Sequence, residues 1–252
     1  MFIMKNEVKI HEVSSSPLKG RREFLKFSGL AVASTGLIMM GCNNDDDDPV
    51  MIDKQLPGTR NGKFDLGGKD FGVLSYAYAL EQLEADFYAK VVNASSFTTT
   101  FNAIEQQVLT DLYRHEVIHR EFFKTALTGA LPNPSSQLLP ALAFNYGNLN
   151  FNNRAEVLAT AKALEDTGVA AYNGAGRILT NPDYLLLAGK IVSVEARHAS
   201  AIRSLINPNS ADFAGDDVVN ATTGLDVAKT PSQVLPIAGG FITTPFTAQF
   251  LP

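Results

Sequence analysis

The sequence predicts an all-α protein, with a four-helix bundle followed by a loop-rich C-terminal extension. Apolar side chains recur at helical spacing in four long segments, all of them after residue 69. Two of the links between these segments are short, whereas the central link holds about 25 residues rich in Pro, Asn and Gly. Because the chain has one cysteine, a buried core and not internal disulfides must hold the fold together.

The expected helices carry start and stop signals. Asp70 is expected to cap the N-terminus of the first helix. The fourth opens at Asn181-Pro182, a capping residue followed by proline at the first helical position, and closes at Asn207-Pro208. The pattern predicts four helices, over about residues 70–93, 101–127, 153–179 and 182–205.

The lengths of the links determine the expected topology. The short links force the first and second helices, and the third and fourth, into antiparallel hairpins. A 27-residue helix is about 40 Å long, and the central link can stretch to about 80 Å, so it can run the length of the bundle. The sequence therefore predicts two hairpins joined by one long crossover within residues 70–206. A long disordered loop is the alternative reading of the same segment.

The C-terminal extension, residues 207–252, carries no recognisable chemistry. Thr230-Pro231-Ser232-Gln233 is typical of a capping box that opens a short helix. Phe241 and Phe246 are expected to pack this extension onto the bundle.

Residues 1–41 have the features of an export signal. A basic start is followed by an apolar run of 14 residues, Phe27 to Met40, which is too short for a stable membrane anchor of about 20 residues. Arg21-Arg22, with Phe24-Leu25-Lys26 after them, resembles the twin-arginine signal that exports folded proteins, although Gly20 stands where Ser or Thr is usual.

Met39-Met40-Gly41-Cys42 resembles a lipoprotein box, with Met39 in place of the usual Leu. It implies an exported protein, periplasmic or at the cell surface, that is held to the membrane through a lipidated Cys42. A coincidental cysteine after a plain signal is the alternative.

Residues 42–69 are expected to form an acidic linker, because Asp45-Asp46-Asp47-Asp48 lies there. A spacer and a surface-export tag are both compatible with this run. Six of the 21 Lys and Arg, and three of the 26 Asp and Glu, precede Cys42, so the remaining chain has a formal charge of -8. Such a domain repels phosphate backbones, which argues against a nucleic acid partner.

Six polar side chains fall on the apolar faces of the expected helices. The second and fourth helices each contain Glu-x-x-His, which places a carboxylate and an imidazole on one side of a helix. The first and third each place one glutamate on the apolar stripe. These six candidate metal ligands are Glu81, Glu116, His119, Glu165, Glu195 and His198.

Buried carboxylates are costly unless something compensates their charge. Two divalent cations would balance four glutamates, and carboxylate with imidazole suits iron, manganese or zinc. A lone Glu-x-x-His is a weak signal and a lone glutamate is usually solvated. However, two of the three histidines after Cys42 lie in this motif, and the halves mirror each other, because Tyr88 follows Glu81 at the same offset as Tyr172 follows Glu165. This is the ligand pattern of di-iron and di-manganese bundles.

Residues 70–206 resemble the ferritin-like superfamily. Together with the twin-arginine signal, the chain resembles the bacterial family of exported ferritin-like proteins related to plant desiccation-associated proteins. The matching segments are Leu80 to Tyr88, the two Glu-x-x-His motifs and Val234-Leu235-Pro236-Ile237. The resemblance implies two metal ions, with iron as the first expectation and manganese as the second. It also implies how the ligands divide: Glu81 and His119 on one metal, Glu165 and His198 on the other, and Glu116 and Glu195 bridging both.

Four further residues are candidates for supporting roles. Glu84, one turn from Glu81, is an extra ligand or, as we expect, a residue at the solvent edge. His115 either orients a ligand from behind or, as we expect, is a surface histidine. Tyr88 and Tyr172 are expected to pack in the core with hydrogen-bonded hydroxyls, and a redox role stays open.

The sequence favours redox chemistry at the two metals: Fe(II) oxidation, or reduction of dioxygen or peroxide, in stress protection. The alternative is a non-catalytic desiccation- or stress-related surface lipoprotein in which metal is structural or absent. Whether the protein is an enzyme is therefore left open, as is a homodimer. The sequence has no cysteine cluster and no Gly-rich dinucleotide loop, so an electron donor would come from outside.

Overall fold

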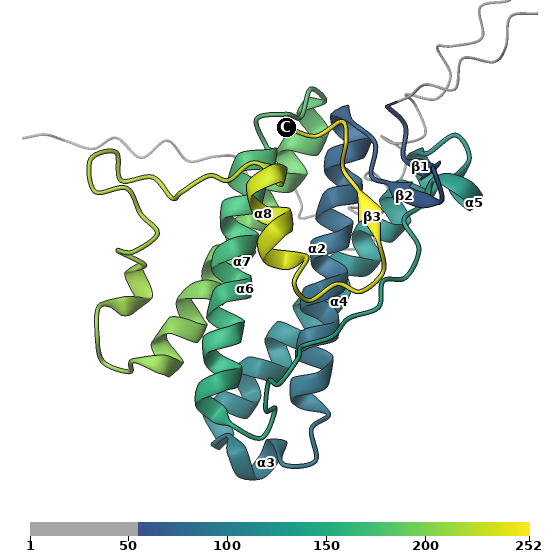
Figure 1. Cartoon of the computed structure of the whole chain (residues 1–252). Helices are drawn as coiled ribbons and strands as arrows, with labels where there is room; N and C mark the ends of the chain where they lie inside the picture. The colour runs from purple at the N-terminus through teal and green to yellow at the C-terminus, as the bar shows by residue number, and fades with distance from the viewer. Residues whose placement is uncertain (1–54) are drawn as a thin grey trace, which may run out of the picture. The chain divides into compact units, whose positions relative to one another are not determined.

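A computed structural model describes residues 55–252 (Figure 1). The predicted signal peptide, its Arg21-Arg22 pair, Cys42 and the acidic run of the linker lie outside the described residues. Within residues 55–252, no helix combines the length and the apolar character needed to cross a membrane.

Four long helices dominate the structure and confirm the predicted all-α bundle. Helix α2 packs most extensively on α4, and α6 packs most extensively on α7, so the chain forms two helical hairpins (Figure 1). The helices are α2 (Lys69–Val92), α4 (Ala103–Ala130), α6 (Arg154–Ala175) and α7 (Pro182–Ile206). The link between α2 and α4 contains the short helix α3 (Phe97–Thr100).

Two of the predicted helix ends need correction. Gly68, not Asp70, is the N-cap of α2. The Asp70 carboxylate instead accepts hydrogen bonds from the backbone N–H groups of Thr180 and Asn181, at 2.7 and 3.1 Å, and thereby ties α2 to the link between α6 and α7. Helix α6 ends at Ala175, four residues earlier than expected.

The start of α7 follows the prediction. The Asn181 side chain accepts a hydrogen bond from the backbone N–H of Asp183 at 2.9 Å, and Pro182 occupies the first turn. Helix α4 has a complete capping box, in which Asn102 and Glu105 each accept a hydrogen bond from the other's backbone N–H.

The central link is an ordered crossover. It contains the short helix α5 (Pro134–Gln137) and then runs along the bundle toward α3 (Figure 1). Leu139, Leu142 and Tyr146 are buried in the core. Gln82 of α2 fixes the crossover by donating to the carbonyl oxygen of Pro140 at 3.3 Å and accepting from the backbone N–H of Leu142 at 2.9 Å. The alternative of a long disordered loop is therefore wrong.

The C-terminal chain returns across the bundle. Helix α8 (Pro231–Ala238) packs on α6 and α2, and its predicted capping contact is present, because the Thr230 N–H donates to Gln233 Oε1 at 2.9 Å. Strand β3 (Phe246–Thr247) runs parallel to β2 (Lys63–Asp65), which pairs antiparallel with β1 (Gly58–Arg60). These three short strands were not predicted.

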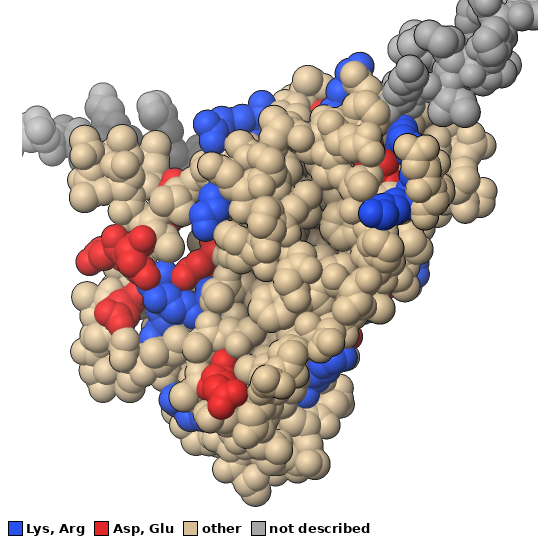
Figure 2. Space-filling model, viewed as in Figure 1, with Lys and Arg blue, Asp and Glu red and all other residues tan. Residues whose placement is uncertain are grey.

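Close packing and ion pairs hold the segment between α7 and α8 to the second hairpin, which is formed by α6 and α7. A Cβ at Gly174 would lie 1.8 Å from the carbonyl oxygen of Lys229, so only glycine lets this segment approach α6. After α7, the chain passes through the short helix η2 (Asp212–Ala214), and Asp217 then pairs with Arg203 at 2.6 Å and Lys162 at 3.0 Å. Charged side chains gather over this part of the face shown in Figure 2.

Candidate metal centre

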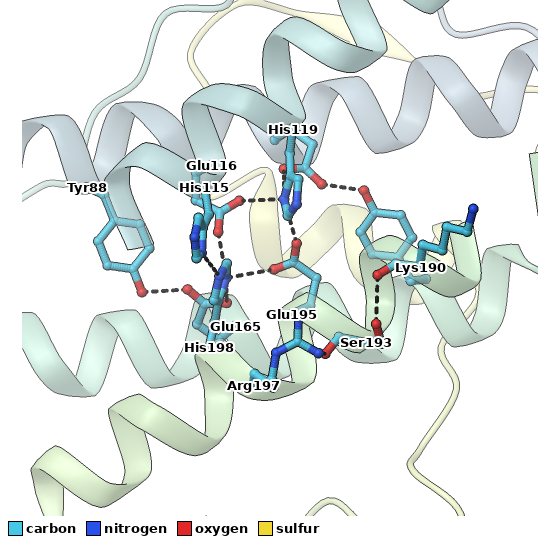
Figure 3. Close-up of polar contacts among 12 residues, drawn as sticks. Tyr88, His115, Glu116, His119, Glu165, Lys190, Ser193, Glu195, Arg197 and His198 are labelled. Atoms are coloured by element: carbon cyan, nitrogen blue, oxygen red, sulfur yellow. Dashed lines mark hydrogen bonds and ion pairs between the residues drawn. The ribbon is translucent and has the colours of Figure 1, made fainter. Parts of the chain in front are cut away.

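The bundle brings all six predicted ligands together in its interior. Figure 3 shows this cluster, with Glu116, His119, Glu165, Glu195 and His198 labelled. The four glutamates are fully buried, with an exposed fraction of 0% each, while His198 and His119 are 3% and 9% exposed. Each of the four long helices contributes, because α2 and α6 give one glutamate each, and α4 and α7 give one Glu-x-x-His each. The spacing of three residues puts each glutamate and its histidine on the inward side of one helix.

Two tyrosines fix the single glutamates of α2 and α6. The Tyr88 hydroxyl on α2 donates to Glu165 Oε1 on α6 at 2.5 Å, and the Tyr172 hydroxyl on α6 donates to Glu81 Oε1 on α2. Each tyrosine therefore binds the glutamate of the opposite hairpin. One carboxylate oxygen of each glutamate is held in this way, whereas the Oε2 atoms of Glu81 and Glu165 have no hydrogen-bond partner within residues 55–252.

The first group of ligand atoms surrounds the His119 ring. His119 Nδ1 lies 2.9 Å from Glu195 Oε1, 3.4 Å from Glu116 Oε2 and 3.4 Å from Glu81 Oε2. The nitrogen is close to three oxygens but is not directed at any of them as in a hydrogen bond. Such atoms face a common point between them, as ligands of a cation do.

The second group surrounds the His198 ring in the same way. His198 Nδ1 lies 2.7 Å from Glu116 Oε1, 3.4 Å from Glu195 Oε2 and 3.5 Å from Glu165 Oε2. In each group, one atom per residue can be chosen so that all lie within 4.8 Å of one another.

Glu116 and Glu195 belong to both groups and divide their oxygens between them. Glu116 turns Oε2 to His119 and Oε1 to His198, while Glu195 turns Oε1 to His119 and Oε2 to His198. Two carboxylates that each face both groups could bridge two adjacent cations, which is the role that the resemblance implies for Glu116 and Glu195.

The unpaired atoms of the centre fit the ligand set of metal ions. Eight buried atoms of the candidate ligands lack a hydrogen-bond partner among the described residues. Each such atom, if left unsatisfied, would lower the stability of the fold by about 1–3 kcal/mol. Metal ions between them would compensate this cost. The donors are carboxylate oxygens and imidazole nitrogens without sulfur, a set that suits iron, manganese or zinc. The eight atoms are Oε2 of Glu81 and Glu165, both oxygens of Glu116 and Glu195, and Nδ1 of His119 and His198.

The electrostatics show how the same groups behave without a cation. Burial raises the pKa of Glu116 well above its ordinary value, and that of Glu165 to about 7. Burial also disfavours ionised Glu195, but contacts with both imidazoles reverse this and lower its pKa to about 2. Burial lowers the pKa of His198, yet its carboxylate neighbours outweigh this and raise the pKa to about 12. Without a cation, protons therefore neutralise the cluster.

The prediction that Glu84 lies at the solvent edge is wrong. The side chain is buried, with an exposed fraction of 3%, and its Oε2 has no hydrogen-bond partner in the described part of the chain. Glu84 Oε1 lies 3.0 Å from the point where a Cβ of Gly168 would stand, so the missing side chain on α6 makes room for it. Burial, and then the charges of the four clustered glutamates, raise the pKa of Glu84 well above its ordinary value.

His115 is exposed, as expected, but it also contacts a candidate ligand. Its Nδ1 lies 2.9 Å from His198 Nε2, on the side of the ring away from the carboxylates (Figure 3). His115-Glu116-Val117-Ile118-His119 is also an H-E-x-x-H string, which in zinc hydrolases puts both histidines on one cation. Here His115 belongs to neither four-residue group, so the arrangement is a different one.

The tyrosine contacts predict a change in metal affinity. Replacing Tyr88 or Tyr172 with Phe removes the group that orients a ligand carboxylate, and each change is expected to weaken metal binding about 10–100-fold. Co(II) titration of the chelated protein measures this. Tyr76→Phe on α2 is the matched control, because the Tyr76 hydroxyl is buried and has no hydrogen-bond partner among the residues that the structure describes. An equal loss in Tyr76→Phe would contradict the assigned role.

The pKa shifts predict opposite effects of pH on the chelated and the metal-loaded protein. The pKa values of Glu165 and His198 are raised, so the chelated native state holds more protons than the unfolded state. Its stability is therefore expected to fall as the pH rises from about 5 to about 8. With added Mn(II), ligands release protons on binding, and stability is expected to rise over the same range. Thermal unfolding measures both slopes, and slopes of the same sign would refute the prediction.

Comparison with known proteins agrees with this geometry. No curated protein matches the chain. The profile of one family, described as the ferritin-like domain, matches residues 69–208, which is more than half of the chain and contains all six candidate ligands. The buried carboxylate and imidazole cluster of these residues can hold metal ions. The chain belongs to the ferritin-like domain family.

Proposed function

We propose that this protein is an exported di-metal carboxylate protein that oxidises Fe(II) or reduces dioxygen or peroxide, and so protects against oxidative stress. The observation that carries the proposal is the division of the Glu116 and Glu195 oxygens between two ligand groups. Two cations that share the Glu116 and Glu195 carboxylates would be adjacent, and adjacent cations can share the electrons of a redox step with a small oxygen species or with Fe(II). Iron is the expected metal, and manganese fits the same donors.

The side chains around the cations would set the conditions of this chemistry. The full burial of the four glutamates keeps bulk water away from the centre. Tyr88 and Tyr172 hold one oxygen of Glu165 and Glu81 and leave the other directed inward. The most exposed of the six candidate ligands is His119 on α4, at 9%, and α4 and α7 pack on each other far less than the partners within each hairpin. This suits substrates as small as dioxygen, peroxide or Fe(II).

The sequence before the bundle supports a place outside the cytoplasm. We propose export through the twin-arginine signal in residues 1–41, and attachment to the membrane through a lipidated Cys42. These features also support membership in the exported branch related to desiccation-associated proteins. Cys42→Ala is expected to move the protein from the membrane fraction to the soluble fraction. Undiminished recovery in the membrane fraction would contradict lipid anchoring.

A structural role for the metals is the second candidate, and the eight unsatisfied atoms favour it. Cations there would stabilise the bundle whether or not a reaction occurs, because the buried donors are compensated in either case. Stability and activity must therefore be measured together.

The test is the double variant Glu116→Gln/Glu195→Gln, which keeps the side-chain shapes and removes both bridging charges. We expect bound metal to fall from about two ions per chain to less than one, and Fe(II) oxidation and peroxide loss to fall to the uncatalysed rates. Glu121→Gln, at an exposed position on α4, is the matched control and is expected to keep both. If the wild-type protein binds metal but reacts no faster than the double variant, the metals are structural.

A further inference from the structure

The two halves of the centre repeat the same ligands, but they differ at neighbouring positions, and two of these differences concern side chains at the centre. Helix α6 repeats the Glu and Tyr of α2, and α7 repeats the Glu-x-x-His of α4. Immediately before the Glu-x-x-His, α4 has His115 where α7 has Val194. One turn after the single glutamate, α2 has Glu84 where α6 has Gly168.

The contact between His115 and His198 is a hydrogen bond in the plane of the rings. The two rings are nearly coplanar, with 14° between their planes, and their centroids are 5.1 Å apart. The distance of 2.9 Å between His115 Nδ1 and His198 Nε2 is much shorter than the distance between the centroids, so the two nitrogens lie between the rings. The rings therefore meet edge to edge and are not stacked face to face. The His198 ring is therefore held at its Nε2 while its Nδ1 faces the carboxylates.

This bond selects the form of His198 that can bind a cation. A ligand nitrogen needs a free lone pair, so the proton of neutral His198 must sit on Nε2, from which it donates to His115 Nδ1. Val194 cannot give His119 the same support, because its side chain has no polar atom. His119 is also the more exposed of the two, at 9% against 3%.

Glu84 does not distinguish the two positions. It lies one turn from Glu81 on α2 and against Gly168, one turn from Glu165, on α6, and it belongs to neither ligand group. The difference between the two positions is therefore the support of the imidazole. A cation beside His198 has an imidazole oriented by His115, and Val194 cannot give this support to a cation beside His119.

We propose that His115 is a positioning residue that makes the metal position at His198 and Glu165 the tighter of the two, so that it fills first. The position at His119 and Glu81 is then the weaker, exchangeable one. This inference rests on the proposed di-metal centre and adds an order of loading to it.

The test is a stepwise titration of the chelated full-length protein with Co(II), followed by visible absorption and calorimetry. The wild-type protein is expected to bind two ions in two resolved steps. His115→Ala is expected to weaken the first step about 10–100-fold and leave the second unchanged. His115→Asn, which keeps an acceptor near Nδ1, is expected to restore most of the loss, and Val194→His to strengthen the second step. Circular dichroism checks that each variant is folded.

A second readout separates positioning from a general effect on stability. In the Zn(II)-loaded wild type, the Nε2–H proton of His198 is expected to appear in nitrogen-edited NMR spectra as a hydrogen-bonded signal, and to be lost in His115→Ala. Two equal wild-type affinities, or unchanged steps in His115→Ala, would overturn the inference while the di-metal function stands. A wild-type protein that binds no Co(II) would overturn both.

Discussion

Acidic side chains that face inward from four packed helices need positive charge between them, and the rest of the structure depends on this constraint. Glu81, Glu116, Glu165 and Glu195 have no exposed surface, and two imidazoles are their nearest neutralising groups. Two imidazolium charges cannot balance four carboxylates, so further protons or cations must complete the balance. Protons would neutralise the cluster but leave most of its donor atoms without directed partners. Cations satisfy both the charge and the geometry.

The architecture of the bundle assembles this centre. The two hairpins meet at the cluster, and the tyrosine of each binds the single glutamate of the other. The crossover must therefore return the chain to the end from which α6 can run beside α2, and Gln82 holds it in place on the way. Helix α8 then packs on α6 and α2, and strand β3 pairs with β2. Packing thus creates the site, and the cations would in turn stabilise the packing.

The sequence predicted most of the fold because helical periodicity and link lengths are local properties. The four helices and the crossover follow from them, whereas the end of α6 at Ala175 and the cap at Gly68 were missed, because several residues compete for each helix end. Strand β3 was missed because it pairs with residues about 180 positions away, and β1 and β2 were missed because each is only three residues long.

The candidate ligands could be found because the Glu-x-x-His motif occurs twice and each single glutamate is followed by a tyrosine at the same offset, which is a pattern within the sequence itself. The surroundings of the ligands depend on tertiary contacts and could not be read in this way. Glu84 was assigned to the solvent edge, since nothing in its own helix shows that Gly168 leaves space for it. The bond between His115 and His198 likewise joins residues 83 positions apart.

Anomalous X-ray diffraction from crystals of the protein, purified from its native host without added metal, tests the central claim most directly. We predict two anomalous peaks between Glu116 and Glu195, one beside His119 and one beside His198, with an absorption edge that identifies the element. Ordered density for all four glutamates with no anomalous scatterer between them would contradict the account.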